Sequence, residues 1–471
     1  MRQAAALGRV SDVARALMLS RQLLGHDRWT DAELRAHQQR ELTELVRHAK
    51  ARSAFYRELY QDVDTDGEVE LAQLPAVDKA TMMSNFDRVV TDPRLRLSEL
   101  ESHLDGLAGD ERYLGEYRVM ATGGSTGRKG IFVADQREWR HCLAGFFRLN
   151  EYMGVRPRLP RRLKLAAIAA PRPQHMTYRM SASVDVGLHR VLRLDATAPA
   201  ETLVAPLNRH RPDFLYGYPS ILGLLAVEQL EGRLRIAPAI IASSGETYTE
   251  ETASAIREAW DAPWFELYGT TENGILGSHC PTREGLHLME DTTIVEIVDE
   301  HDRPVPPGRC GHKLLVTNLV NRVQPLIRYA ISDMVTATGQ PCPCGRPFRV
   351  LAGIQGRNDD ILRLPAAAGG EIAVHPLAIR SPLAAVAGLK QYRIKQTARG
   401  LQVRATLRAN AAREPANAAI EHGLRATLAG LGVEPLEIAV QFMDRIDGAR
   451  DAAGKFKLVE AHRRHVSQEH R

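Results

Sequence analysis

The sequence has few of the features that mark secreted or membrane proteins. It holds 5 cysteines in 471 residues, a low and odd number that fits a reducing compartment better than a disulfide framework. No segment reaches the ~18 consecutive apolar residues of a membrane-spanning helix. The first 25 residues are interrupted by Arg9, Asp12 and Arg15, so they do not form the apolar stretch of a signal peptide. We therefore expect a cytoplasmic protein that does not enter a membrane.

The sequence also lacks a strong excess of charge of one sign. Lysine and arginine number 62 and aspartate and glutamate 57, which gives a net charge of +5. A charge this small and this dispersed does not favour a nucleic-acid partner. The hydrophobic fraction of 44% and the charged fraction of 25% are typical of soluble globular proteins. Because 471 residues exceed what one core accommodates, we expect two or three domains.

A glycine-rich stretch lies between two short apolar runs, residues 119–121 and 131–133. Such a turn between strands can hold backbone N–H groups around an anion, because glycine allows a close approach of the phosphate. We interpret it as a triphosphate-binding loop; the alternative is a glycine-rich surface hairpin. It is not a Walker loop, since no serine or threonine follows the lysine. The loop comprises Thr122, Gly123, Gly124, Ser125, Thr126, Gly127, Arg128 and Lys129.

Apolar runs that alternate with helical segments predict an α/β sheet. Residues 1–60 are expected to be helical, with a capping box formed by Thr30 and Glu33. Four later runs are expected to be buried strands, and several of them end in clusters of Gly, Ser, Thr or Glu that we expect to meet at one edge. His175 follows the first of these strands and would lie either in a pocket or in a solvated loop. The four runs are residues 163–170, 214–217, 238–242 and 264–268.

Six motifs in order resemble the phenylacetate–CoA ligase family of the adenylate-forming superfamily, which also contains acyl-CoA synthetases, adenylation domains and luciferases. Any one of these motifs is weak evidence, but six in the same order are specific. They span residues from about 30 to 460 when the flanking segments are included. The motifs are Leu74-Pro75 with Lys79, the loop 122–129, Tyr268 to Glu272, Arg328-Tyr329 with Asp333, Gly356 to Asp360, and Gly454-Lys455.

The resemblance implies a domain organisation. A large N-terminal domain of α/β layers would span residues 1–356, with a helical segment up to about residue 95. A small, mobile α+β domain would span residues 357–471 and swing about a hinge at Asp359. Alternation of apolar and polar residues over 392–407 predicts a strand pair in this second domain, and residues 416–431 a helix.

The resemblance also implies an activity: ATP-dependent activation of a carboxylic acid, aryl or small, to an acyl-AMP with release of pyrophosphate. It assigns catalytic roles to Glu272, which would bind Mg²⁺, to Arg357, and to Lys455, and it places Asp333 on the ribose. The acid pocket would lie near His175, Tyr216 and Tyr218. The residues implied around the adenine and in the same motifs are Ser244, Gly245, Glu246, Tyr268, Gly269, Thr270 and Thr271.

Departures from the family pattern leave the acyl acceptor open. Gly123 replaces a hydroxyl residue, Lys129 a common proline, and Ala330 a common arginine, and residues 364–371 differ from the usual glycine-centred segment. The acceptor could be CoA, a carrier protein, an amine or a hydroxyl. Two alternatives are an amide- or ester-forming adenylase that does not use CoA and a nucleotide-binding module without turnover.

The cysteines suggest a second site. Cys280, His287, Cys342 and Cys344 would form a Cys₃His tetrahedral zinc site of structural type, and some members of the family carry similar Cys and His positions. The alternative is four separate residues. His279 is a possible substitute ligand, whereas Cys142 and Cys310 are expected to be ordinary free thiols.

Overall fold

The computed structural model of the chain describes residues 2–122, 129–155, 162–170, 172–187, 189–248, 250–357, 360–374, 376–384, 386–408, 411–444, 446 and 457–461. The predicted residues Gly123 to Arg128, Asp359 and Lys455 therefore lie outside the described residues. Within the described part of the chain, no helix has both the length and the apolar character needed to span a bilayer.

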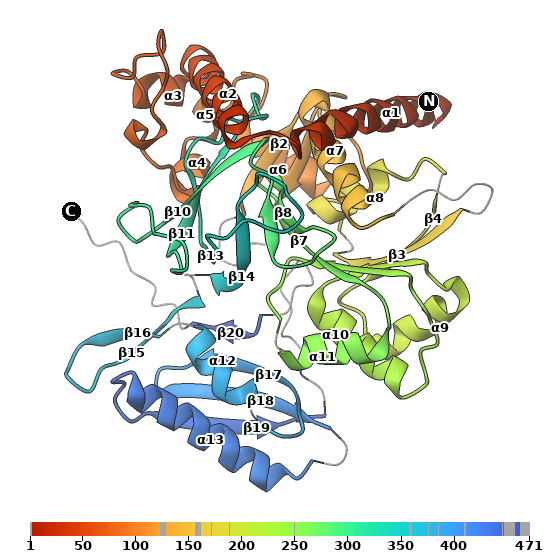
Figure 1. Cartoon of the computed structure of the whole chain (residues 1–471), viewed down its shortest axis with the longest axis vertical. Helices are drawn as coiled ribbons and strands as arrows, with labels where there is room; N and C mark the ends of the chain where they lie inside the picture. The colour runs from red at the N-terminus through yellow and green to blue at the C-terminus, as the bar shows by residue number, and fades with distance from the viewer. Residues whose placement is uncertain are drawn as a thin grey trace.

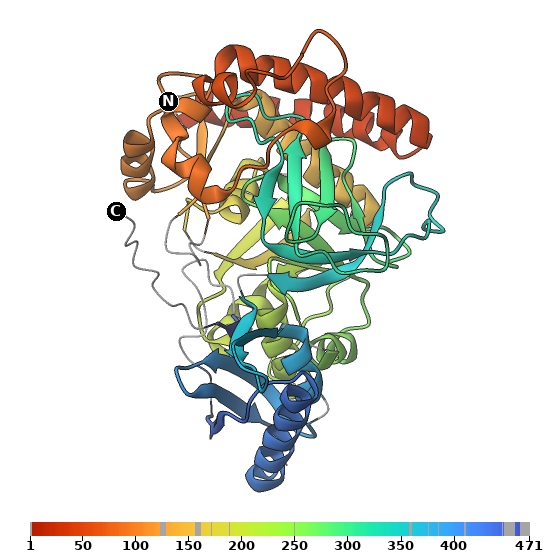
Figure 2. The same cartoon turned by 90° about the vertical axis from the view of Figure 1, so that its left-hand side faces the viewer.

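The N-terminal region is helical, as the sequence predicts, and lies at the top of the molecule in Figures 1 and 2. The capping box is confirmed: Thr30 Oγ1 accepts from the Glu33 N–H at 3.2 Å, and Glu33 accepts from the Thr30 N–H at 2.7 Å. Asp78 caps the helix that begins at Lys79. The helices are α1 (Arg2–His26), α2 (Asp31–Arg52), α3 (Ala54–Leu59), the 3₁₀ turn η1 (Leu71–Gln73), α4 (Lys79–Ser84), α5 (Phe86–Val89) and α6 (Leu97–Asp105).

A nine-stranded mixed sheet forms the centre of the molecule (Figure 1). The order is β13-β14-β9-β8-β7-β6-β5-β3-β4; strands β4, β3, β5, β6 and β7 are parallel, and the pairs from β7 to β13 are antiparallel. The strands are β3 (Leu163–Ala169), β4 (His189–Asp195), β5 (Phe214–Gly217), β6 (Ile240–Ser244), β7 (Trp264–Thr270), β8 (Gly274–His279), β9 (Leu286–Leu288), β13 (Asp333–Ala337) and β14 (Val350–Arg357).

Helices cover both faces of this sheet, which confirms the α/β prediction. Neighbouring strand residues point to opposite faces, so Phe214 packs in the cluster that contains Leu149 of α7, whereas Leu215 packs against the helices on the other face. The four predicted strands 163–170, 214–217, 238–242 and 264–268 correspond to β3, β5, β6 and β7. The helices are α7 (Gln136–Tyr152), α8 (Met176–Ser183), α9 (Ala200–His210), α10 (Pro219–Leu230) and α11 (Glu250–Ala259).

Two smaller sheets flank the centre. The hairpin of β1 (Arg118–Ala121) and β2 (Ile131–Ala134) carries the predicted phosphate loop between its strands. β10 (Thr293–Val298), β11 (Lys313–Asn318) and β12 (Tyr329–Ile331) form an antiparallel sheet. The hairpin and this sheet share one hydrophobic cluster with the N-terminal helices, since Val119, Leu314 and Leu45 all belong to it.

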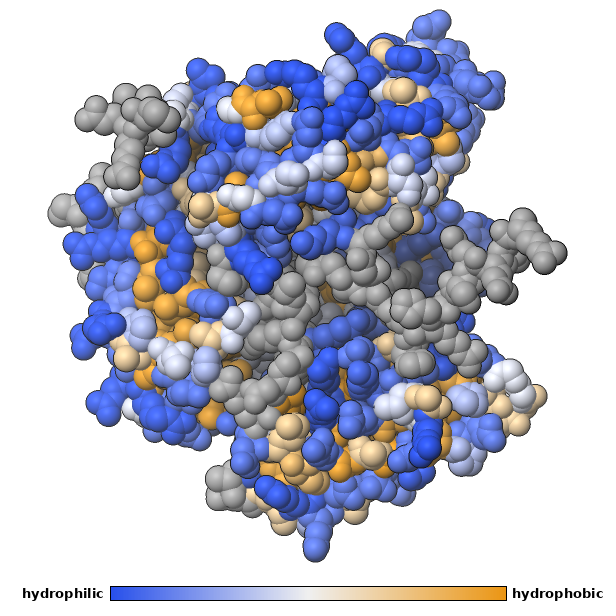
Figure 3. Space-filling view, turned by 180° about the vertical axis from the view of Figure 1, so that it is seen from behind, coloured by the Kyte–Doolittle hydropathy of each residue, from blue (hydrophilic) through white to orange (hydrophobic). Residues whose placement is uncertain are grey.

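The C-terminal segment packs around a hydrophobic cluster of its own, from Leu362 to Val459, in a body at the bottom of Figures 1 and 2. The space-filling view from behind is mostly hydrophilic and is hollowed on one side between this body and the rest (Figure 3). The predicted strand pair and helix are confirmed as β17, β18 and α13. The elements are β15 (Leu362–Pro365), β16 (Glu371–Val374), α12 (Pro376–Ala384), β17 (Leu389–Gln396), β18 (Gly400–Leu407), α13 (Arg413–Gly430), β19 (Glu437–Phe442) and β20 (Val459–Glu460).

Candidate active site

The parallel strands bring several of the predicted residues to one edge of the sheet, because the carboxyl ends of parallel strands point the same way. At the ends of β5 and β6, the hydroxyl oxygens of Tyr216 and Ser244 lie 2.6 Å apart. Gly245 follows with a φ of 81°, a left-handed conformation that glycine adopts without steric cost. Glu246 then accepts a hydrogen bond from the backbone N–H of Ser220 at 3.0 Å, which fixes this loop to the start of α10.

Tyr268, Asp333 and Arg357 form a hydrogen-bonded group at this edge. Tyr268 donates its hydroxyl to Asp333 Oδ2 at 2.8 Å, and Arg357 donates Nε to Oδ1 at 3.0 Å. Burial raises the pKa of Tyr268 well above its usual value, and the adjacent Asp333 carboxylate adds to the rise, so the tyrosine stays a donor. The Asp333 carboxylate likewise raises the pKa of Arg357. Asp333 and Arg357 are register partners in the β13–β14 pair, whereas Tyr268 comes from β7, which is not a neighbour of either strand.

Glu272 lies in the turn after β7 and faces the same group. Burial raises the pKa of its carboxyl, against the attraction of Arg357 and Lys79. Lys79, the first residue of α4, donates Nζ to Thr122 Oγ1 at 3.1 Å. The same Thr122 oxygen accepts from the Gly130 N–H at 2.9 Å and closes the base of the glycine-rich loop. A cation and a carboxylate thus flank the point where this loop begins.

The remaining predicted residues lie near the same edge but in different surroundings. His175 is 6% exposed and precedes α8. Tyr218 is 1% exposed, and its hydroxyl accepts from the Ala170 N–H at 3.2 Å, so it ties the end of β3 to the start of α10. Thr270 Oγ1 accepts from the Asn273 N–H at 3.1 Å within the Glu272 turn. Gly269 and Thr271 lie in the same segment, and Lys129 is exposed.

The four predicted zinc ligands come together. Their ligand atoms all lie within 4.8 Å of one another; Cys280 Sγ is 3.7 Å from Cys342 Sγ, and Cys344 Sγ is 3.4 Å from His287 Nε2. Zinc bonds of about 2.3 Å to sulfur and about 2.0 Å to nitrogen give tetrahedral edges of roughly 3.8 and 3.5 Å. The residues therefore fit a tetrahedral Zn²⁺ ion. The neighbouring Thr282 hydroxyl lies 3.0 Å from Cys280 Sγ, where it would support that ligand.

His279, the possible substitute, does not belong to this cluster of four; its Nδ1 accepts from the Glu266 N–H at 3.1 Å. Cys142 and Cys310 are free thiols, as predicted. Burial raises the pKa of Cys142 to about 12, which makes it a poor nucleophile at neutral pH.

Residues 34–317, more than half of the chain, match the family described as AMP-binding enzyme. The chain belongs to the AMP-binding enzyme family. Among relatives of this AMP-binding enzyme, the phenylacetate-coenzyme A ligase of Thermus thermophilus is 25% identical over 375 residues, which cover 75% of this chain and 76% of that protein. Protein CapK of Staphylococcus aureus is 23% identical over 341 residues, 69% of this chain and 68% of that protein. The predicted resemblance to the phenylacetate–CoA ligase family is thereby confirmed.

Solved structures confirm the predicted fold. A 2-hydroxyisobutyryl-CoA ligase in its postadenylation state with 2-HIB-AMP has a TM-score of 0.72 and 21% identity, over 93% of this chain and 91% of that one. The same ligase with 2-HIB-AMP and CoA in the thioesterification state gives a TM-score of 0.59, with 22% identity and 90% coverage of both chains. The overall arrangement of this AMP-binding enzyme is therefore closer to the first of these two structures.

One residue of this site was absent from the sequence-based assignment. The sequence places Lys79 in a motif but indicates no role for it, because its partner Thr122 lies 43 residues away. The signal that could have identified it is a lysine in the first turn of a helix capped by Asp78.

Proposed function

We propose that this AMP-binding enzyme activates a carboxylic acid and transfers the acyl group to CoA. In the first step, a carboxylate oxygen attacks the α-phosphorus of ATP, and the bond from that phosphorus to the bridging oxygen breaks and releases pyrophosphate. In the second step, the CoA thiolate attacks the acyl carbon and displaces AMP. The name of the Thermus thermophilus relative, a phenylacetate-coenzyme A ligase, and the acyl-AMP and CoA complexes of the structural neighbour support this proposal.

The observation that carries the proposal is the Tyr268, Asp333 and Arg357 group. An ionised carboxylate offers about four acceptor positions, and Tyr268 and Arg357 take one each. The remaining positions of Asp333 suit the two ribose hydroxyls of ATP, which are donors. Because Tyr268 and Arg357 hold the carboxylate in one orientation, the nucleotide would meet a pre-formed acceptor.

The phosphates would lie between the glycine-rich loop and Glu272. Lys79 and Thr122 supply an ammonium and a hydroxyl where the loop begins, and loop residues 123–129 would continue the cradle. Glu272 would hold Mg²⁺ together with phosphate oxygens, since this ion prefers oxygen ligands; the ion would neutralise the phosphate charge. Lys455 would act on the α-phosphate and the carboxylate, where negative charge gathers during the attack.

The acid would bind beyond β5 and β6. Tyr216 and Ser244 present paired hydroxyls there, and His175 lies in the neighbouring segment after β3. Tyr218 would support this wall from behind through its hydrogen bond to Ala170. Aromatic and imidazole side chains with few charges suit an aryl or small organic acid.

We further propose that residues 357–471 form a separate domain that pivots near Asp359, and that the Cys₃His cluster holds a structural Zn²⁺. The separate hydrophobic cluster from Leu362 to Val459 supports the first proposal, and the tetrahedral distances among the ligand atoms support the second. Such an ion would link the strand that follows the Glu272 turn to the loop before β14.

The test is carboxylate-dependent exchange of labelled pyrophosphate into ATP. The panel comprises benzoates, phenylacetates, hydroxycinnamates and short aliphatic acids, first without CoA. Exchange with one acid class is the expected result, and adding CoA should then release AMP and form a thioester. Exchange without thioester formation would favour an amine, hydroxyl or carrier-protein acceptor. ATP binding without exchange for any acid would contradict the proposed activation step.

A further inference from the structure

The turn that carries Glu272 is fastened by the residue that follows it. Asn273 is 9% exposed, and its backbone N–H donates to Thr270 Oγ1 at 3.1 Å. Its side-chain Nδ2 donates to Thr293 Oγ1 at 2.9 Å. Thr293 is 1% exposed and is the first residue of β10. Asn273 therefore joins the Glu272 turn of the central sheet to a different sheet.

Packing restricts the turn on the next residue as well. Gly274 has a φ of 79°, and a Cβ at this position would lie 2.6 Å from Cys142 Sγ on α7. Neither the conformation nor the space allows a side chain there. The turn therefore packs directly against α7, and this packing prevents it from moving towards that helix.

Beside this contact lies a small cavity, where packing does not restrain the turn. Its volume is about 40 Å³, and its lining includes Asn273, His141 and Thr293. Among the described residues, Asn273 Oδ1 and His141 Nδ1 have no hydrogen-bond partner. The hydrogen bond from Asn273 to Thr293 therefore holds the turn at the edge of a space that no side chain fills.

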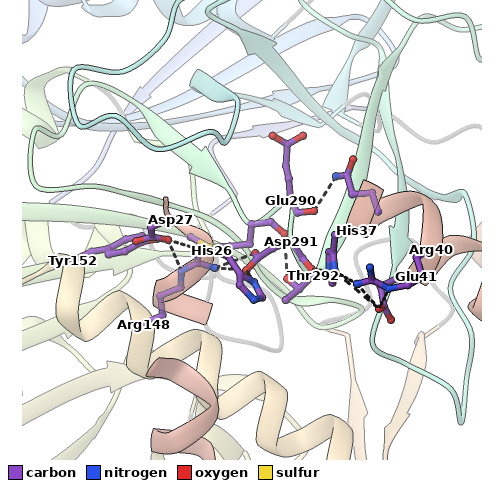
Figure 4. Close-up of polar contacts among 12 residues, drawn as sticks. His26, Asp27, His37, Arg40, Glu41, Arg148, Tyr152, Glu290, Asp291 and Thr292 are labelled. Carbon is purple, nitrogen blue, oxygen red and sulfur yellow. Dashed lines mark hydrogen bonds and ion pairs between the residues drawn. The ribbon is translucent and has the colours of Figure 1, made fainter. Parts of the chain in front are cut away.

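Thr293 is itself held firmly by the loop before it. Figure 4 shows the side chains of Arg148, from α7, and His26, from α1, next to that of Asp291. Arg148 Nη1 donates to both carboxylate oxygens of Asp291, at 3.0 and 2.9 Å, and His26 Nδ1 lies 2.9 Å from Oδ2. Asp291 is 3% exposed. The Thr293 hydroxyl, which accepts the hydrogen bond from Asn273, therefore belongs to a segment that is held in place.

We propose that Asn273 is a positioning residue, which orients the Glu272 carboxylate for the Mg²⁺ of bound ATP through its hydrogen bond to Thr293. The proposal rests on the proposed role of Glu272. A metal-binding carboxylate must be held within a fraction of an ångström of its productive position, by supporting residues behind it. Asn273 and Thr293 would provide that support.

The experiment compares Asn273→Leu, Thr293→Val and the double variant with the wild type. Calorimetry of ATP binding at increasing Mg²⁺, without any acid, gives the Mg²⁺ concentration for half-maximal binding. Each single variant should raise this concentration roughly fivefold, the effect of one lost hydrogen bond. The double variant should need about the same Mg²⁺ concentration as the more impaired single variant, because both substitutions remove the same hydrogen bond.

Ser53→Ala serves as the matched control. Ser53 is fully buried and donates to the Arg88 carbonyl at 2.8 Å in the N-terminal helices, so its loss should lower the melting temperature without changing the Mg²⁺ requirement. An unchanged requirement in Thr293→Val, which keeps the shape of the side chain, would overturn the proposal even if Asn273→Leu failed to fold. Additive effects in the double variant would overturn it too.

The same data separate this proposal from the proposed function. A wild type whose ATP binding does not depend on Mg²⁺ would refute the role of Glu272, and the role of Asn273 with it. Mg²⁺-dependent ATP binding without pyrophosphate exchange would refute only the proposed reaction, and a shift in the variants would still support the role of Asn273.

Discussion

Replacing Asp291 by asparagine should destabilise the protein strongly although the shape of the side chain hardly changes. The Asp291 side chain is 0% exposed and that of Arg148 is 1% exposed, so their charges are paired away from water. Breaking such a pair costs roughly 3–5 kcal/mol, because one buried charge loses its partner. Arg148 keeps Asp27, to which it donates Nε at 3.1 Å. We therefore expect the lower end, about 3 kcal/mol.

Urea unfolding provides the assay. With a dependence on urea of about 3 kcal/mol per molar, the midpoint of Asp291→Asn should fall by about 1 M. Fluorescence would report the transition, because Trp29 stacks on His26 at 3.7 Å between ring centroids, beside Asp291. The control is Asp185→Asn. Asp185 forms an ion pair with Arg193 at 3.0 Å, and the two side chains are 39% and 34% exposed, respectively. Exposed pairs contribute under about 1 kcal/mol, so its midpoint should hardly move.

The pH dependence gives a second check on the same variant. Burial alone would raise the pKa of Asp291, but Arg148 and His26 outweigh burial and hold the pKa below the usual 3.8. A carboxyl with a lowered folded-state pKa stabilises the protein above its unfolded-state pKa and loses that contribution as the pH falls. The deficit of the variant should therefore be complete at pH 7 and shrink below about pH 4. Equal midpoints at pH 7 would refute the reasoning.

Three further predictions concern the proposed sites. Lys79→Met should raise the KM for ATP roughly tenfold in the exchange assay, since a cation is lost beside the phosphates. The control Lys50→Met, which loses a hydrogen bond to the Val63 carbonyl, should leave this KM unchanged. Lys455→Ala should lower the exchange rate by roughly tenfold or more at nearly unchanged ATP affinity; full activity would contradict its role. Metal analysis should give about one zinc per chain, with X-ray absorption distances of about 2.3 Å to sulfur and 2.0 Å to nitrogen; metal-replete protein without zinc would rule the site out.

Local patterns in the sequence were sufficient for the elements and for part of the site. A capping box needs only residues three apart, and Thr30 and Glu33 form one. Apolar runs located β3, β5, β6 and β7, and the glycine and hydroxyl residues after several of them marked the strand ends that carry Tyr216 and Ser244. The chemistry of the ligand set, together with the family resemblance, also predicted the Cys₃His cluster, whose ligand atoms lie within 4.8 Å of one another.

Contacts between distant residues could not be predicted in this way. Asn273 and Thr293 show no pattern that marks them as partners, since each is also common in an ordinary turn. Nothing in the sequence indicated that Arg148 would meet Asp27 and Asp291, which lie 121 and 143 residues away along the chain. Such pairs are selected by the packing of whole elements, and one sequence carries no record of that packing.

The position of Asp27 has a consequence for synthesis of the chain. Its carboxylate accepts hydrogen bonds from Tyr152 and Arg148 of α7 and from Arg346, which lies 319 residues further along the chain. During translation, α1 therefore leaves the ribosome long before Arg346, one of the partners of Asp27, exists. Late long-range contacts slow folding and leave apolar surface exposed meanwhile. We expect nascent chains that end before residue 346 to hold α1 loosely and to be good substrates for chaperones.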